Sequence, residues 1–247
     1  MASVSFETLT GDFDQEESTK GINNQQWTSL ATYWTTLGSN TVTLEIDDLD
    51  YDGNDVNGGT LTTFSTLLNG NGAAEPDLVV TDLSIDFANL YSAWSALDGS
   101  SQNNLLWRTM LAGGDTIDLG ATSFKIIFAG DGNFLETGEI ATGGDDTFTG
   151  TVGTSSEIAG DLSTVNTGRT LYGGADTMTI TGSGSLIEIS GDATTVLYGT
   201  LAGGDDTLVV TIFGGGNVSG DAHSVQYSSF LGGNDTITVS FGNPSAI

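Results

Sequence analysis

The chain has 247 residues, with 32 Asp and Glu against 4 Lys and Arg, which gives a formal net charge of −28. Nucleic acid and anionic membrane surfaces are therefore not expected as partners, because contacts with phosphate groups need Lys and Arg. The absence of Cys and the presence of a single His exclude disulfides and thiolate metal sites and argue against zinc chemistry.

Residues 1–105 do not repeat, and we expect them to form a small α+β domain with an aromatic core that caps a repeat domain at residues 106–247. Apolar residues recur at helical spacing in three segments, which are residues 27–37, 61–68 and 87–97. Two further segments, residues 41–47 and 76–83, are typical of strands. An aromatic patch for sugar or lipid is an alternative use of this region.

One motif in the N-terminal half is rich in Asp. Asp48, Asp50 and Asp52 precede Gly53 in the order that opens an EF-hand calcium loop. The twelfth position is Gly59 instead of Glu, so the full EF-hand is absent. The motif predicts either a smaller calcium site or an acidic surface turn.

The C-terminal half contains two motifs that repeat with one period. Gly-Gly pairs recur at spacings of 29 to 30 residues, and each is followed by an Asp-Thr pair. Gly-Asp pairs lie between them at spacings of 29 to 31 residues. The candidate residues are Gly113, Gly143, Gly173, Gly203 and Gly232, then Asp115, Asp146, Asp176, Asp206 and Asp235, and the Gly-Asp residues Asp131, Asp161, Asp192 and Asp221.

Apolar positions keep the same register as these motifs. Examples are Phe148, Met178 and Leu208, each directly after an Asp-Thr pair. Four such apolar ranks and two glycine-rich corners predict a mainly β fold, a parallel β-roll or β-solenoid with coils of about 30 residues. Stacked coils place equivalent residues roughly 4.8 Å apart.

Stacking also predicts cations at the corners. Carboxylates about 5 Å apart repel by roughly 3 kcal/mol per pair at an effective dielectric of about 20. Several such pairs exceed the stability of an ordinary domain, about 5–15 kcal/mol. Carboxylate and carbonyl oxygens suit Ca²⁺, so we expect several Ca²⁺ ions at two corners of each coil. The alternative is solvated turns with splayed carboxylates.

The segments LAGGDT, ATGGDDT, LYGGADT, LAGGDDT and LGGNDT resemble the RTX family of hemolysin-type calcium-binding repeat proteins. The closest likeness is to a longer variant that alternates Gly-Asp-Ala with Gly-Gly-x-Asp-Thr, over residues 111–240. The resemblance implies Ca²⁺ between coils and type I secretion through an uncleaved C-terminal signal. Residues 1–21 do not read as a conventional signal peptide, which is compatible with that route. Ala175 departs from the acidic or amide residue of the other long copies.

These observations favour a non-enzymatic, calcium-binding structural protein outside the cell, in a surface layer, a matrix or an adhesion module. A homo-oligomer or ordered assembly and a cell-surface glycan are possible partners. No segment approaches about 18 consecutive apolar residues, so we expect no membrane insertion.

Three other functions are open. A virion or another self-assembling particle would need no secretion signal. Threonine rows on one face would suit an ice-binding solenoid. A secreted hydrolase would need catalytic carboxylates among Asp47, Asp48, Asp82 and Asp86. The metalloprotease motif H-E-x-x-H and the esterase motif G-x-S-x-G are both absent, which argues against an enzyme.

Overall fold

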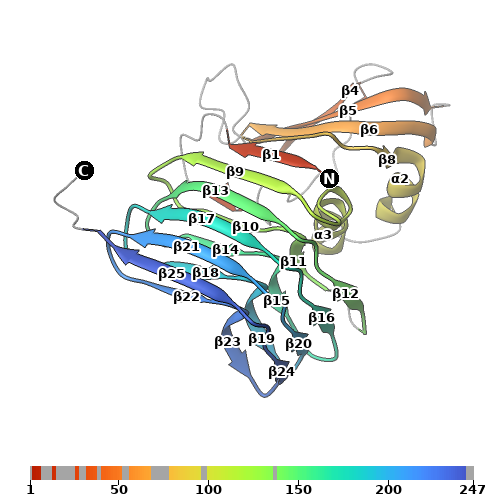
Figure 1. Cartoon of the computed structure of the whole chain (residues 1–247). Helices are drawn as coiled ribbons and strands as arrows, with labels where there is room; N and C mark the ends of the chain where they lie inside the picture. Colours follow the sequence, from red (N-terminus) through yellow and green to blue (C-terminus); the bar gives the residue numbers. More distant parts are fainter. Residues whose placement is uncertain are drawn as a thin grey trace.

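The computed structural model describes residues 2–6, 13–14, 26–27, 32–37, 40–51, 56–67, 78–95, 99–135 and 138–242. The fold is mainly β, and a parallel β-solenoid occupies residues 116–241 with coils of about 30 residues. The N-terminal part of the chain covers one end of the solenoid (Figure 1). The predicted fold class is thereby confirmed. No helix in the described part of the chain is long and apolar enough to cross a membrane.

Each complete coil adds one strand to each of four parallel sheets. The first sheet contains β9 (Thr116–Ala121), β13 (Thr147–Val152), β17 (Thr177–Gly182), β21 (Thr207–Ile212) and β25 (Thr236–Phe241). The second contains β10 (Ile126–Ala129), β14 (Glu157–Ala159), β18 (Ile187–Ser190) and β22 (Gly216–Ser219). The third contains β11 (Gly132–Phe134), β15 (Leu162–Val165), β19 (Ala193–Leu197) and β23 (Ala222–Gln226). The fourth contains β12 (Ile140–Thr142), β16 (Thr170–Tyr172), β20 (Thr200–Ala202) and β24 (Ser229–Leu231).

The register within the sheets follows the sequence period. Phe148 pairs with Met178, and Met178 pairs with Leu208, and all three side chains are fully buried. Threonines on either side of this file point outward, because successive residues of a strand face opposite sides of the sheet. The apolar ranks found in the sequence therefore become continuous files of the core.

The solenoid contains two separate apolar clusters. The larger one lies between the first and second sheets and continues into the cap. The smaller one lies between the third and fourth sheets and comprises Leu135, Leu162, Val165, Leu171, Ala193, Val196 and Leu201. Each coil is therefore divided into two lobes, and the corner motifs join one lobe to the other.

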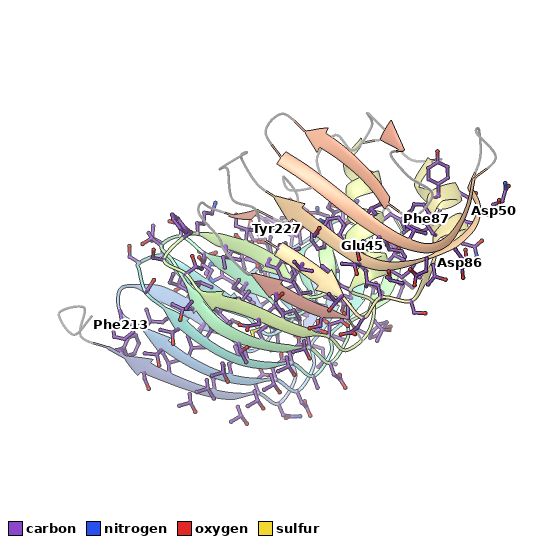
Figure 2. All side chains as sticks on the ribbon, turned by 90° about the horizontal axis from the view of Figure 1, so that it is seen from above. Glu45, Asp50, Asp86, Phe87, Phe213 and Tyr227 are labelled. Carbon is purple, nitrogen blue, oxygen red and sulfur yellow. The ribbon has the colours of Figure 1, made fainter. Side chains whose placement is uncertain are left out.

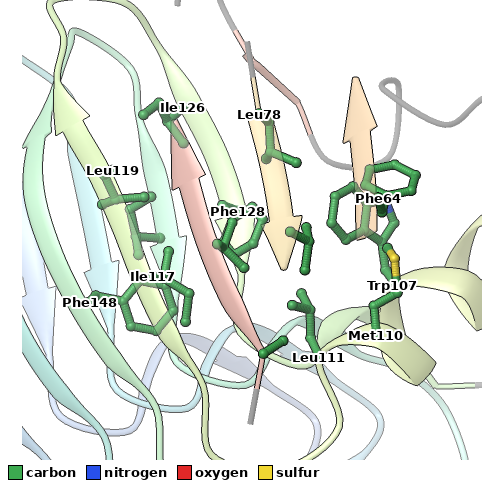
Figure 3. Close-up of a cluster of buried hydrophobic side chains, with 14 of the residues drawn as sticks. Phe64, Leu78, Trp107, Met110, Leu111, Ile117, Leu119, Ile126, Phe128 and Phe148 are labelled. Atoms are coloured by element: carbon green, nitrogen blue, oxygen red, sulfur yellow. The ribbon is translucent and has the colours of Figure 1, made fainter. Parts of the chain in front are cut away.

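The cap extends the first sheet with one parallel strand followed by antiparallel strands, and two helices pack against the cap and the first coil. Its elements are β1 (Ser3–Phe6), β3 (Gln26–Trp27), β4 (Thr32–Leu37), β5 (Asn40–Tyr51), β6 (Val56–Leu67), β7 (Leu78–Thr81), β8 (Ile85–Asp86), α2 (Phe87–Ser95) and α3 (Gly99–Met110). A further short strand, β2 (Phe13–Asp14), joins the second sheet. Edge-to-face ring contacts run from Phe64 through Trp107 and Phe128 to Phe148, with centroids 5.2, 6.0 and 6.4 Å apart. Figure 3 shows these rings in one continuous core across cap and solenoid.

Some expectations for the cap are confirmed and others are wrong. The predicted strands at 41–47 and 76–83 correspond to β5 and β7, and the predicted helix at 87–97 corresponds to α2. The predicted helix at 27–37 is wrong, since the described residues there form β3 and β4, and β4 is rich in Thr, Tyr and Trp, which favour strands. Helix α3 was not predicted, and it runs across the expected domain boundary at residue 105.

The predicted helix at 61–68 is also wrong, because its described residues, 61–67, belong to β6. Leu61 and Phe64 are both fully buried although they are three positions apart, which would place them on opposite faces of a regular strand. The pairing with β5 shifts register opposite these residues, and a β-bulge of this kind restores both side chains to one face. The bulge thus produces an apolar spacing that imitates a helix.

Candidate metal centre

The two corner motifs of the repeat face each other across each coil. The Gly-Asp motifs join the second sheet to the third, and the Gly-Gly-x-Asp-Thr motifs join the fourth sheet to the first. The Gly144 amide donates to the Asp131 carboxylate at 2.6 Å, and the Gly174 amide donates to the Asp161 carboxylate at 3.1 Å. The Gly204–Asp192 and Gly233–Asp221 contacts repeat this bond at 2.9 and 2.6 Å. We call the region between the two lobes, formed by these motifs, the waist.

The sequence predicted two corners per coil, and the structure has a corner at each of the two motifs. Spacing along the chain does not fix the shape of a coil, and here the two lobes bring both motifs together. We call a Gly-Asp carboxylate and the next Gly-Gly-x-Asp carboxylate one rung. The four rungs are Asp131 with Asp146, Asp161 with Asp176, Asp192 with Asp206, and Asp221 with Asp235. Electrostatic repulsion acts between the two carboxylates of every rung.

Glycine is required at the waist because backbone and carboxylates approach closely. A Cβ atom at Gly160 would lie 1.8 Å from Oδ2 of Asp176, and one at Gly173 would lie 1.6 Å from Oδ1 of Asp192. Real Cβ atoms do not approach other atoms so closely. Gly143 and Gly203 have equivalent contacts with the Asp161 and Asp221 carboxylates, and a Cβ at Gly232 would lie 2.8 Å from Asp221. Gly113, at the first coil, has a positive φ of 92° and no such neighbour.

The second Asp of each rung also belongs to a hydrogen-bond ladder along the solenoid axis. The backbone amide of Asp115 donates to Oδ1 of Asp146, and that of Asp146 donates to Oδ1 of Asp176, both at 2.7 Å. Asp176 donates to Asp206 at 2.7 Å, and Asp206 donates to Asp235 at 3.0 Å. The ladder fixes one oxygen of each carboxylate and directs the other into the waist.

The rungs stack along the solenoid axis into a column of carboxylates. Several of these carboxylates have one oxygen that is buried and lacks a hydrogen-bond partner in the protein. Asp161 and Asp192 are 0% exposed, and Asp146 and Asp176 are 1% exposed. Buried Oδ2 atoms without a hydrogen-bond partner occur at Asp115, Asp146, Asp176, Asp192 and Asp206. A buried carboxylate oxygen with no partner is strongly unfavourable, so the waist needs protons or cations.

The pKa values of these carboxyl groups show the same requirement. Burial, reinforced by the neighbouring Asp146 carboxylate, raises the pKa of Asp176 to about 10. Burial and the Asp131 carboxylate raise the pKa of Asp146 to about 9. Burial followed by repulsion from Asp176 also raises the pKa of Asp161 well above its ordinary value. Without cations, the centre of the column therefore stays protonated at neutral pH.

The donor set of the waist fits a hard divalent cation. Each rung offers two carboxylates, and the glycine corners bring backbone carbonyl oxygens next to them, as in the approach of Gly191 O to Gly160. No cluster of three or more acidic or His side chains suited to a metal occurs among the residues that the structure describes. An ion in the waist would therefore combine carboxylates with carbonyl oxygens, which is a donor set that Ca²⁺ accepts.

The variable residue of the Gly-Gly-x-Asp motif lies outside the waist. Asp145 and Asp205 are exposed, and each accepts a hydrogen bond from the backbone amide of its counterpart in the next coil, Ala175 and Asn234, at 2.8 and 2.7 Å. Ala175 is exposed as well. Its departure from the repeat consensus therefore leaves the buried carboxylates unchanged.

The Asp-rich motif of the cap lies apart from the solenoid, at the end of the long cap strands, as the position of Asp50 in Figure 2 shows. Asp48 and Asp50 are exposed residues of β5, and Asp48 has a positive φ of 53°. Asp52 lies outside the described residues, so a calcium site at this motif stays a prediction. A surface depression is lined by Asp48 and Asp86, among others. Asp86 is already bonded there, because its carboxylate accepts two hydrogen bonds from Asn89 next to the start of α2, at 3.0 and 2.8 Å.

Two residues of α3 next to the first coil were not anticipated. Arg108 forms an ion pair with Glu139, with both N–O distances 2.7 Å, and lines a cavity of about 90 Å³ beside Asp131, Gly113 and Gly143. Asn104 is buried against β11. Neither belongs to the repeat, so its period could not reveal them.

Comparisons of the chain with protein-family models, with curated proteins and with solved structures found no match.

Proposed function

We propose that the waist binds a column of Ca²⁺ ions and that the solenoid folds stably when they bind. The observation that carries this proposal is the set of buried carboxylate oxygens without protein partners, stacked from coil to coil. Cations between the rungs would satisfy these oxygens and replace repulsion with coordination. Because no nitrogen or sulfur side chain contributes to the rungs, hard cations are favoured over Zn²⁺ or Cu²⁺.

Ca²⁺ suits the waist better than Mg²⁺. Mg²⁺ demands near-ideal octahedral geometry and retains several waters, whereas Ca²⁺ accepts six to eight oxygen ligands in flexible geometry. Asp161 and Asp192 are fully buried in the waist, and its donors are fixed by the backbone ladder. It therefore suits an ion that gives up its water to carboxylate and carbonyl oxygens.

We further propose a non-enzymatic, extracellular structural role, in keeping with the resemblance to RTX proteins and their type I secretion. The stacked carboxylates are enclosed between the two lobes, where a substrate does not reach them. Millimolar calcium outside cells would neutralise the acidic column. A partner such as a surface glycan or further copies of the chain would bind the outer faces.

Circular dichroism of the full chain with and without chelator tests the calcium proposal. We expect the metal-free protein at neutral pH to lose strand signal, and millimolar Ca²⁺ to restore it, because the ions bind only the folded waist. Equal concentrations of Mg²⁺ are the control and should restore much less. A spectrum that chelator and Ca²⁺ both leave unchanged would contradict the proposal.

Ice binding is a second candidate, favoured by the outer face of the first sheet. Three neutral files run in register across β13 to β25. They are Thr147, Thr177, Thr207 and Thr236, then Thr149, Thr179, Val209 and Thr238, then Thr151, Thr181, Thr211 and Ser240. Hydroxyl and methyl groups recur about every 4.8 Å across the strands and about every 6.6 Å along them. These files carry no charge although the chain has a net charge of −28.

A freezing-hysteresis measurement in Ca²⁺ tests this second function. We expect hysteresis in the parent protein and its loss in Thr179→Lys, which places a charge in the central file. Thr195→Lys, on the third sheet, is the matched control and should retain activity. Absence of hysteresis in a protein with intact strand signal would exclude ice binding without affecting the calcium proposal.

A further inference from the structure

The N-terminal segment of the cap has the form of a partial coil. β1 pairs in parallel with β9, so Val4 lies opposite Ile117 just as Ile117 lies opposite Phe148 in the next coil. β2 pairs in parallel with β10, so the same segment also extends the second sheet. Residues distant from the repeat in sequence thus occupy two of the four strand positions of a coil that would precede the first.

This partial coil also continues the ladder of the waist. Thr116 N donates to Ala2 O at 3.1 Å, as Thr147 N donates to Asp115 O at 2.8 Å. Ala2 N in turn donates to the Asp115 carboxylate, as Asp115 N donates to that of Asp146. Ala2 therefore stands where the preceding aspartate of the ladder would be. Its methyl group replaces a carboxylate, and the acidic column ends there.

Helix α3 covers the third and fourth sheets at the same end. Asn104 is 1% exposed, and its side-chain amide donates to Phe134 O at 2.6 Å and accepts from Phe134 N at 3.2 Å. It thus bonds the edge of β11 as a neighbouring strand would. Arg108, held by Glu139 directly before β12, packs against Gly132. The first coil therefore receives protein contacts on its first three sheets, and at Glu139 beside the fourth, without a metal ion.

The last coil lacks comparable cover within the described residues. Ile237 is 42% exposed, whereas Ile117 in the same file is 0% exposed. Phe230 is 46% exposed, whereas Leu171 and Leu201 in its file are 0% and 1% exposed. The rung of Asp221 and Asp235 is also more exposed than the inner rungs. The last coil thus has less protein support than the first coil.

We propose that the N-terminal segment is a built-in template on which the solenoid folds, so that Ca²⁺ ions fill the waist in order from the Asp131–Asp146 rung to the Asp221–Asp235 rung. This inference rests on the proposed calcium binding and adds its direction. In a repeat protein each coil is stabilised mainly by its neighbours, so the coil that already has a neighbour forms first. Each folded coil then presents half of the next site.

Hydrogen exchange of the full chain, followed by mass spectrometry after addition of Ca²⁺ to chelated protein, tests the order. We expect peptides covering β9 to β11 to become protected before peptides covering β21 to β24, and chelator to remove protection in the reverse order. The opposite order, or simultaneous protection of all coils, overturns the template. Exchange that does not respond to Ca²⁺ overturns the calcium proposal as well, so the two failures are distinguishable.

A pair of variants in one apolar file sharpens the test. Ile117→Ala in the first coil and Leu208→Ala in the fourth remove side chains that are both fully buried. We expect Ile117→Ala to raise the half-saturating Ca²⁺ concentration of every coil at least fivefold. Leu208→Ala should raise it only for the fourth coil and β25. Equal effects of both variants on all coils overturn the template. If Ile117→Ala does not fold, the order in which the coils of the parent protein become protected from hydrogen exchange decides between the two outcomes.

Discussion

At the residue scale, the aspartates of the waist differ from surface aspartates in what they contribute to the metal-free fold. Asp176 accepts one backbone hydrogen bond through Oδ1 and leaves Oδ2 buried without a partner. Its neighbours Asp146 and Asp206 are also carboxyl groups, and their repulsion in the ionised form adds to the effect of burial on the pKa of Asp176. The carboxylate therefore destabilises the fold without a cation and stabilises it with one, because the same oxygens become ligands.

Asp176→Asn is expected to have opposite effects in the two states. The amide keeps an oxygen for the Asp146 amide and needs no proton uptake on folding, so the metal-free protein should unfold at an equal or higher temperature. Calcium affinity should fall about tenfold or more, which corresponds to roughly 1.4 kcal/mol or more per ion. Calcium titrations and thermal unfolding measure both quantities.

Asp118→Asn is the matched control for this variant. Asp118 is exposed on the first sheet, and its carboxylate accepts a hydrogen bond from Gly120 N that an Asn oxygen can also accept. Calcium affinity and unfolding temperature should both stay at the parent values. A loss of metal-free stability in Asp176→Asn would show that the carboxylate serves the fold without cations.

At the element scale, the column of rungs acts as one titrating unit. Burial is the main cause that raises the pKa of Asp206 to about 7, of Asp192 to about 8 and of Asp146 to about 9, with neighbouring carboxylates adding to it. In an unfolded chain these groups return to their ordinary value of 3.8. The folded, metal-free waist therefore binds more protons than the unfolded chain over this range of pH.

The sign of the resulting pH dependence follows from this proton uptake. The contribution of these carboxyl groups to the stability of the metal-free fold is fully present below about pH 4 and is lost as the pH rises through about 7 to 10. Thermal unfolding in chelator should thus occur at a higher temperature at about pH 5.5 than at about pH 8.5. With Ca²⁺ the order should reverse, since protons compete with the ions for the same oxygens. Greater stability of the chelated protein at the higher pH would contradict this description of the waist.

At the scale of the whole molecule, the repeat in the sequence predicts the solenoid, whereas the cap has no repeat from which its structure could be predicted. The files of Phe148, Met178 and Leu208 were predictable, because one period and one strand spacing determine which residues stack. The meeting of both motifs in one waist was not predictable, because it depends on the division of each coil into two lobes. The helix predicted at 61–68 was wrong because the bulge beside Leu61 allows an apolar spacing in a strand that is also typical of a helix.

The contacts between the cap and the first coil could not be predicted from the sequence either. Ala2 and Asn104 bond to the first coil from outside the repeat, and nothing in their local sequence marks them as partners of Asp115 and Phe134. Such long-range contacts depend on the path of the whole cap. They make cap and solenoid one body with a shared core that contains Trp107 and Phe128.

The most direct test of the central claim is a crystal structure of the protein grown with Ca²⁺. The predicted result is a line of ions along the waist, with an ion between successive rungs bound by carboxylates of both rungs, such as Asp176 and Asp192, and by glycine carbonyl oxygens. A waist whose carboxylates share protons and hold no ion, or calcium bound only at the Asp48–Asp50 motif of the cap, would contradict it.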